Sequence, residues 1–169
     1  CNAATQEAIF EKTDKAVAEG FKYLRVAYSD YDGPSLDESY LCLRNECKHY
    51  DPKRHMRSIV SLLEALRDRY GDEKELITDT HERLDPSDAI VLAKELEPLH
   101  LYFMEDPLSP ENLSWLGRLR ESCVTPIAIG EVFSHPFEWQ QVIQNRWTDF
   151  IRCHLSAVGG LTPARKIAA

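Results

Sequence analysis

The sequence contains no hydrophobic run long enough to cross a membrane, and no signal peptide opens it. It also lacks a basic surplus, because 28 acidic residues outnumber 20 basic ones and the net charge is −8. Nucleic acid and anionic membrane surfaces are therefore poor partners for this chain. We expect a cytoplasmic protein.

A disulfide framework is missing as well. The five cysteines are an odd number and show no framework spacing, which indicates reduced thiols. Cys42, Cys47 and His49 lie together, but no fourth zinc ligand accompanies them. Plain loop residues are favoured over a zinc site there.

Three acidic residues follow short apolar runs that are partly β-branched. These are Asp79, Glu105 and Glu131, and each of the last two lies 26 positions after the one before it. A repeat of this length suits one strand, one helix and two loops, so the strands should be parallel and their carboxyl ends should share a rim. Three unpaired anions repel one another, which points to a hard divalent cation, Mg²⁺ rather than zinc. The alternative, three helix caps or solvated loop acids, is disfavoured by the equal spacing.

The order of candidate elements predicts an α/β fold. Strands are expected near residues 23–28, 76–81, 101–106, 127–131 and 150–155, and helix-start signals with proline follow the strands. A closed eight-stranded barrel needs roughly 250 residues. We therefore predict a partial (β/α)8 TIM-type barrel with five to six of the eight βα units, in which residues 1–169 form one fragment. The helix starts are Asp51-Pro52, Asp85-Pro86, Ser109-Pro110, His135-Pro136 and Thr162-Pro163.

Residues 29–50 show no periodicity and are rich in turn formers. A loop of about twenty residues is more often a lid or a binding loop than a connector. It carries Tyr31 and Tyr40.

A histidine and two arginines accompany the acids. If the strand continues to residue 81, Asp79 and His81 face the same side, and His81 is the best acid or base candidate. The alternative is a hydrogen-bonded histidine that supports the loop. Arg25 and Arg152 interrupt apolar strands, so each is suited to bind a carboxylate or hydroxyls, although Arg25 is equally compatible with a structural ion pair. Such a rim suits removal of a proton next to a carboxylate.

These residues resemble the enolase superfamily and, within it, the mannonate dehydratase group that includes starvation-sensing-protein homologues. The resemblance covers nearly the whole chain. The motifs that carry it are Asp-Thr-His-Glu-Arg-Leu at 79–84, Met-Glu-Asp-Pro at 104–107, Ile-Gly-Glu at 129–131, Asp-Phe-Ile-Arg at 149–152 and Gly-Gly-Leu-Thr-Pro-Ala-Arg at 159–165.

The resemblance implies a magnesium-dependent hydro-lyase. It implies loss of water from a small acid sugar such as D-mannonate, giving a 2-keto-3-deoxy acid, and a homo-oligomer formed through the barrel. Asp79, Glu105 and Glu131 would be the Mg²⁺ ligands, and His81 the acid that protonates the departing hydroxyl.

Three further roles follow from the same resemblance. Arg152 would contact the substrate, and Arg25 would partner a tyrosine base. That base is placed at Tyr31 by position, with Tyr28 and Tyr40 as alternatives, because the loop is shorter than in the more active family members.

The sequence also departs from the family. An N-terminal capping domain, the first barrel strand and the last two strands have no counterpart in these 169 residues. Two readings besides the dehydratase stay open. One is a catalytically weak or inert sensing homologue that binds a sugar acid, and the other is a truncated product whose exposed barrel edge would promote pairing.

Overall fold

The computed structural model describes residues 1–29 and 50–169 and divides the chain into two units, Cys1–Thr78 and Asp79–Ala169. Most of the predicted binding loop, including Tyr31, Tyr40, Cys42, Cys47 and His49, lies outside the described residues.

The strands of the described residues form a six-stranded sheet in chain order, β1-β2-β3-β4-β5-β6. Registers are parallel for β1 with β2, β2 with β3, β4 with β5 and β5 with β6. An open parallel sheet whose strands alternate with helices confirms the α/β prediction and matches a partial barrel. The strands are β1 (Asn2–Ala3), β2 (Tyr23–Tyr28), β3 (Glu75–Asp79), β4 (Phe103–Glu105), β5 (Ile127–Ile129) and β6 (Phe150–Ile151).

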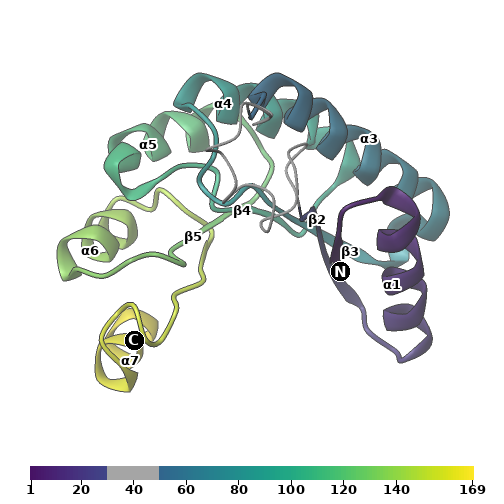
Figure 1. Ribbon diagram of the computed structural model, residues 1–169. Helices are drawn as coiled ribbons and strands as arrows, with labels where there is room; N and C mark the ends of the chain where they lie inside the picture. The colour runs from purple at the N-terminus through teal and green to yellow at the C-terminus, as the bar shows by residue number, and fades with distance from the viewer. Residues whose placement is uncertain (30–49) are drawn as a thin grey trace, which may run out of the picture. The chain divides into compact units, whose positions relative to one another are not determined.

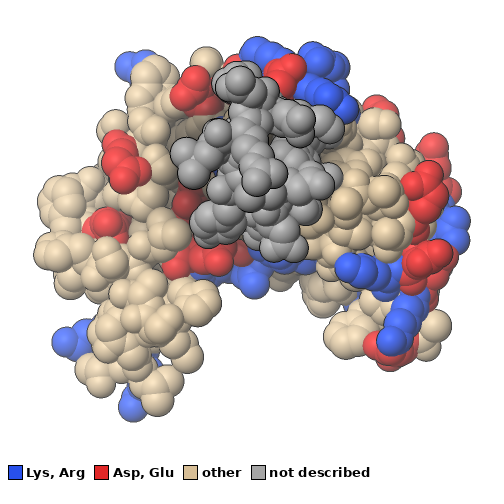
Figure 2. All heavy atoms as spheres, viewed as in Figure 1, with Lys and Arg blue, Asp and Glu red and all other residues tan. Residues whose placement is uncertain are grey.

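The first unit is built from α1 (Gln6–Ala18), α3 (Pro52–Tyr70) and the strands β1 to β3. Asp51 caps α3 as predicted, since its side chain accepts a hydrogen bond from the Arg54 backbone N–H at 3.1 Å. The first turn of α3 holds no acidic residue, and Figure 2 shows Lys and Arg side chains gathered over this end of the helix. The buried side of α3 carries residues at helical spacing, namely Met56, Ile59, Leu62, Leu63 and Leu66.

The second unit contains α4 (Pro86–Glu95), α5 (Leu113–Ser122), α6 (Pro136–Gln144) and α7 (Leu161–Ala168), together with the strands from β4 onward. In Figure 1, α4 and α5 lie on one side of β4 and β5. Every residue of β4 and β5 is buried, which is typical of strands in parallel sheets. The helices bury Leu92 and Ala93 from α4, Leu116 and Leu119 from α5, and Trp139 and Val142 from α6.

Several boundaries differ from the sequence expectation. β3 ends at Asp79 instead of reaching residue 81, and β6 stops at Ile151 instead of residue 155. α7 begins at Leu161, with Gly160 at the N-cap, and so starts ahead of the Thr162-Pro163 signal. Asn2 and Ala3, where the sequence analysis predicted no strand, pair with β2 as the short strand β1. Within the described ranges, no helix has the length and hydrophobicity that crossing a membrane requires.

Candidate metal centre

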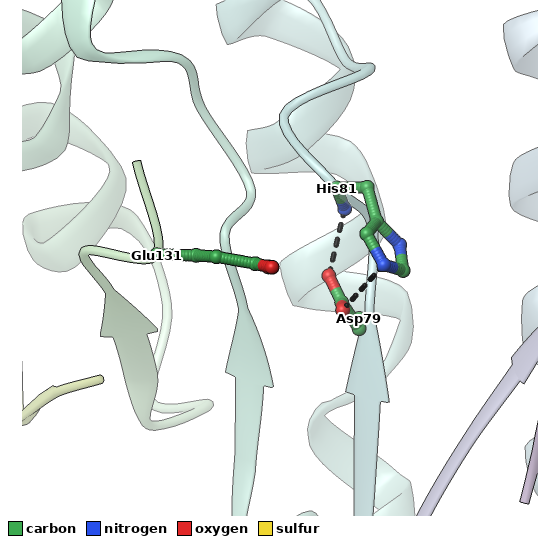
Figure 3. Close-up of side chains that lie close together, drawn as sticks. All are labelled: Asp79, His81 and Glu131. Carbon is green, nitrogen blue, oxygen red and sulfur yellow. Dashed lines mark hydrogen bonds and ion pairs between the residues drawn. The ribbon is translucent and has the colours of Figure 1, made fainter. Parts of the chain in front are cut away.

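Asp79 is the last residue of β3, and its side chain is fully buried. The chain turns sharply after it, because His81 (φ 48°) and Glu82 (φ 60°) both adopt the left-handed conformation. The turn folds His81 back over the carboxylate. The His81 backbone N–H donates to Asp79 Oδ1 at 2.8 Å, and His81 Nε2 lies 3.0 Å from Asp79 Oδ2 (Figure 3).

The convergence of Asp79 and His81 was predicted for the wrong reason. His81 lies in the turn after β3 and not on the strand, so alternation of side chains along a strand does not bring the two together. The left-handed turn and its backbone hydrogen bond do so instead.

Glu131 completes the group. It follows β5 and Gly130, and its carboxylate points toward that of Asp79 (Figure 3). One ligand-type atom from each of Asp79, His81 and Glu131 lies within 4.8 Å of the other two. Two carboxylates at this separation repel each other unless a proton or a cation lies between them.

Glu105, the third predicted metal ligand, ends β4 and is only 3% exposed. Its Oε2 accepts a hydrogen bond from Arg152 Nη1 at 2.6 Å. The Arg152 guanidinium also lies over the Phe103 ring, 5.8 Å from its centroid. The structure therefore pairs two predicted site residues, Glu105 and Arg152, and groups Asp79 and Glu131 separately with His81.

Two further acids crowd this rim, and sequence reasoning assigned a role to neither. Burial raises the pKa of Glu82, and the nearby Glu131 raises it further. Burial also raises the pKa of Asp106 to about 7, opposed by a hydrogen bond from the Gly130 N–H and reinforced by the charges of Glu105, Glu82 and Glu131. The sequence could have indicated both acids, because Asp106 directly follows Glu105 and Glu82 directly follows His81.

The donor set fits a hard divalent cation. Two carboxylates and an imidazole are already grouped, and a third buried carboxylate, Glu105, ends the strand between those of Asp79 and Glu131. Burial is the main cause of the raised pKa values of Glu82 and Asp106, and neighbouring carboxylates add to it. Carboxylate-rich sites favour Mg²⁺ over softer metals.

The other predicted site residues are Arg25, Tyr28 and Tyr31. Arg25 is in the middle of β2 and is half-buried, and Tyr28 ends the same strand; both belong to the first unit. Tyr31 lies outside the described residues.

Parallel βα units with acids at the carboxyl ends of successive strands match part of a TIM-type barrel. A family model described as "Enolase C-terminal domain-like" matches residues 9–169. The chain therefore belongs to this family of the enolase superfamily.

Its relatives include two bacterial proteins of the D-galactonate dehydratase family. The chain is 38% identical to the D-galactonate dehydratase family member RspA of Pantoea ananatis, over 99% of this chain and 44% of the relative. It is 41% identical to a D-galactonate dehydratase family member of Enterococcus gallinarum, over 93% of this chain and 39% of the relative. The chain thus spans less than half of the length of each of these relatives.

A solved structure has the same fold. It is an enolase from Pantoea ananatis with bound D-gluconate and Mg, at a TM-score of 0.84 and 35% identity. The match covers 99% of this chain and 44% of that one.

Proposed function

We propose that this chain carries the metal-binding part of a Mg²⁺-dependent acid-sugar dehydratase, a hydro-lyase that removes water from a substrate such as D-mannonate. The observation that carries the proposal is the group of Asp79, His81 and Glu131 at the carboxyl ends of parallel strands. The family of the relatives and the D-gluconate and Mg in the Pantoea ananatis structure support the acid-sugar class. The chain spans less than half the length of these relatives, so the activity of a whole protein is part of this proposal.

Asp79 and Glu131 would hold the ion through their carboxylates, with Glu105 as the third ligand. When bound, Mg²⁺ supplies stabilisation of the negative charge that develops on the substrate carboxylate as the neighbouring carbon loses its proton. Arg152 now compensates the buried charge of Glu105. A bound ion would compete with the guanidinium for the Glu105 carboxylate, and this would free Arg152 to contact the acid sugar.

His81 would protonate the departing hydroxyl. Asp79 accepts the His81 backbone N–H and faces Nε2 at 3.0 Å, so the carboxylate orients the imidazole ring. Loss of the C2 proton to a base and transfer of a proton from His81 to the C3 hydroxyl release one water and leave an enol, which becomes the 2-keto-3-deoxy acid. Tyr31 as that base and Arg25 as its partner rest on the family resemblance.

A keto-acid assay tests the proposal on the protein that carries this chain, with Mg²⁺ and either D-mannonate or D-gluconate. We expect Asp79→Asn to abolish turnover, because it removes a ligand charge. His81→Asn should lower kcat by about 10² to 10⁴, the usual contribution of a general acid. The exposed Glu121 on α5 provides a charge-matched control, and Glu121→Gln should retain activity.

The same assay separates the dehydratase from a sugar-acid sensor. Binding of Mg²⁺ and of either sugar acid without any turnover would contradict the dehydratase and favour the inert homologue. Turnover that survives Asp79→Asn would contradict the metal assignment.

A further inference from the structure

Asp106 occupies an unusual position between the elements that carry the metal centre. It directly follows β4, is fully buried, and adopts a left-handed backbone with φ 43°. Its backbone N–H donates to the Ala128 carbonyl at 2.9 Å, and its side-chain Oδ1 accepts from the Gly130 N–H at 2.9 Å. Both contacts lie on β5 and its exit, immediately before Glu131.

The Asp106 carbonyl contacts the turn that follows β3. It accepts from the Glu82 backbone N–H at 2.7 Å and from Thr80 Oγ1 at 2.9 Å. Thr80 and Glu82 flank His81 in the turn that folds the imidazole over Asp79. A single residue thus ties the turn after β3 to the exit of β5.

A residue with a side chain would be strained at position 130. Gly130 has φ 129°, and a Cβ added there would lie 3.1 Å from the Phe133 ring. Its buried N–H needs an acceptor, and an unsatisfied one would be costly. Asp106 supplies that acceptor from a left-handed conformation that aspartate and asparagine tolerate better than most residues.

Stability alone does not account for an aspartate here. Its second oxygen, Oδ2, is buried and has no hydrogen-bond partner among the described residues. A buried polar atom of this kind costs free energy. Such costs are kept mainly where a function depends on the residue.

We propose that Asp106 is a positioning residue of the metal centre, which holds the His81 turn and the Glu131 backbone at the separation that cation binding requires. It acts through the Gly130 N–H on one side and through Thr80 and Glu82 on the other. This inference rests on the proposed metal centre.

Calorimetric titration of the full chain with Mg²⁺ compares two substitutions at this position. Asp106→Asn retains an oxygen acceptor for Gly130 and removes the charge, and it should bind Mg²⁺ close to the parent chain. Asp106→Gly removes the acceptor but suits the left-handed backbone. It should weaken Mg²⁺ binding by about tenfold or more, the usual cost of losing a group that orients ligands.

A matched control separates positioning from general loss of stability. Thr125 is buried, and its hydroxyl donates to the Ala93 carbonyl at 2.7 Å, away from the acidic rim. Thr125→Val should lower Tm and leave the Kd for Mg²⁺ unchanged. The proposal is overturned if Asp106→Gly binds as the parent does, or if Asn and Gly weaken binding equally, because charge and not the hydrogen bond would then be responsible.

The hydrogen-exchange rate of the Gly130 amide, measured without metal, tests the role of Asp106 independently of the proposed function. Protection should persist in Asp106→Asn and be lost in Asp106→Gly, and equal protection in both would refute the tie. If the parent chain shows the protected amide but takes up no Mg²⁺, the metal centre fails and Asp106 has no ion to position.

Discussion

Two aspartates, one in each unit, show opposite responses to their surroundings. Asp14 on α1 is partly exposed and accepts hydrogen bonds from the Arg69 guanidinium and the Tyr70 hydroxyl of α3. These two partners lower the pKa of Asp14. Asp106 is fully buried among other acids, and burial raises its pKa to about 7.

The surroundings of the two aspartates explain the opposite pKa shifts. At the α1–α3 contact the acid is neutralised by an arginine and remains solvated, so ionisation favours folding. At the rim of the second unit, burial makes ionisation of Asp106 oppose folding. Strongly shifted pKa values of this kind are found more often at functional sites than in ordinary packing.

The largest expected effect is the pH dependence that Asp106 imposes on the metal-free chain. Its folded pKa lies above the unfolded value, so its contribution is fully present below about pH 4 and is lost as pH rises through about 7. In EDTA, the stability of Asp106→Asn relative to the parent should increase as pH rises from about 4 to about 7, by on the order of a few kcal/mol in total. Urea unfolding at several pH values measures this, and a stability difference that does not change with pH would contradict it.

The next effect concerns the pair formed by Glu105 and Arg152. Arg152→Met leaves a buried carboxylate without its cation, and should destabilise the metal-free chain by roughly 1 to 3 kcal/mol, reduced because Arg152 is partly exposed. If Glu105 is a metal ligand, Mg²⁺ should restore more stability to the variant than to the parent. Thermal melts with and without Mg²⁺ measure this. Equal gains in both chains would argue against Glu105 as a ligand.

The smallest effect is expected at Asp14. Its folded pKa is lowered, so its stabilising contribution is present above the unfolded pKa and disappears as pH falls below about 4. Asp14→Asn should lower Tm slightly at neutral pH and not at strongly acidic pH, opposite to the trend at Asp106. If Asp14→Asn had the same Tm as the parent at every pH, Asp14 would not stabilise the fold and the contrast with Asp106 would be wrong.

The sequence predicted several elements of both units well. Regular spacing of apolar runs gave the parallel strands, and Asp51 and His135 cap the helices that their Asp-Pro and His-Pro signals predicted. Such features depend on residues near one another in the chain, which explains why periodicity and capping rules find them.

Features that depend on distant residues were missed. The pairing of Glu105 with Arg152 joins residues 47 positions apart, and no local pattern contains that information. The left-handed turn at His81 carries no glycine to announce it. The contacts of Asp106 likewise arise from two neighbouring strand ends that meet only in the fold.

Calorimetric titration with Mg²⁺ tests the central claim most directly, using the chain itself beside Asp79→Asn, Glu131→Gln and the exposed control Glu121→Gln. The account predicts one Mg²⁺ site in the parent and the control, and loss of that site in both rim variants, with each protein folded by circular dichroism. A folded parent chain that takes up no Mg²⁺, or rim variants that bind as the parent does, would contradict it.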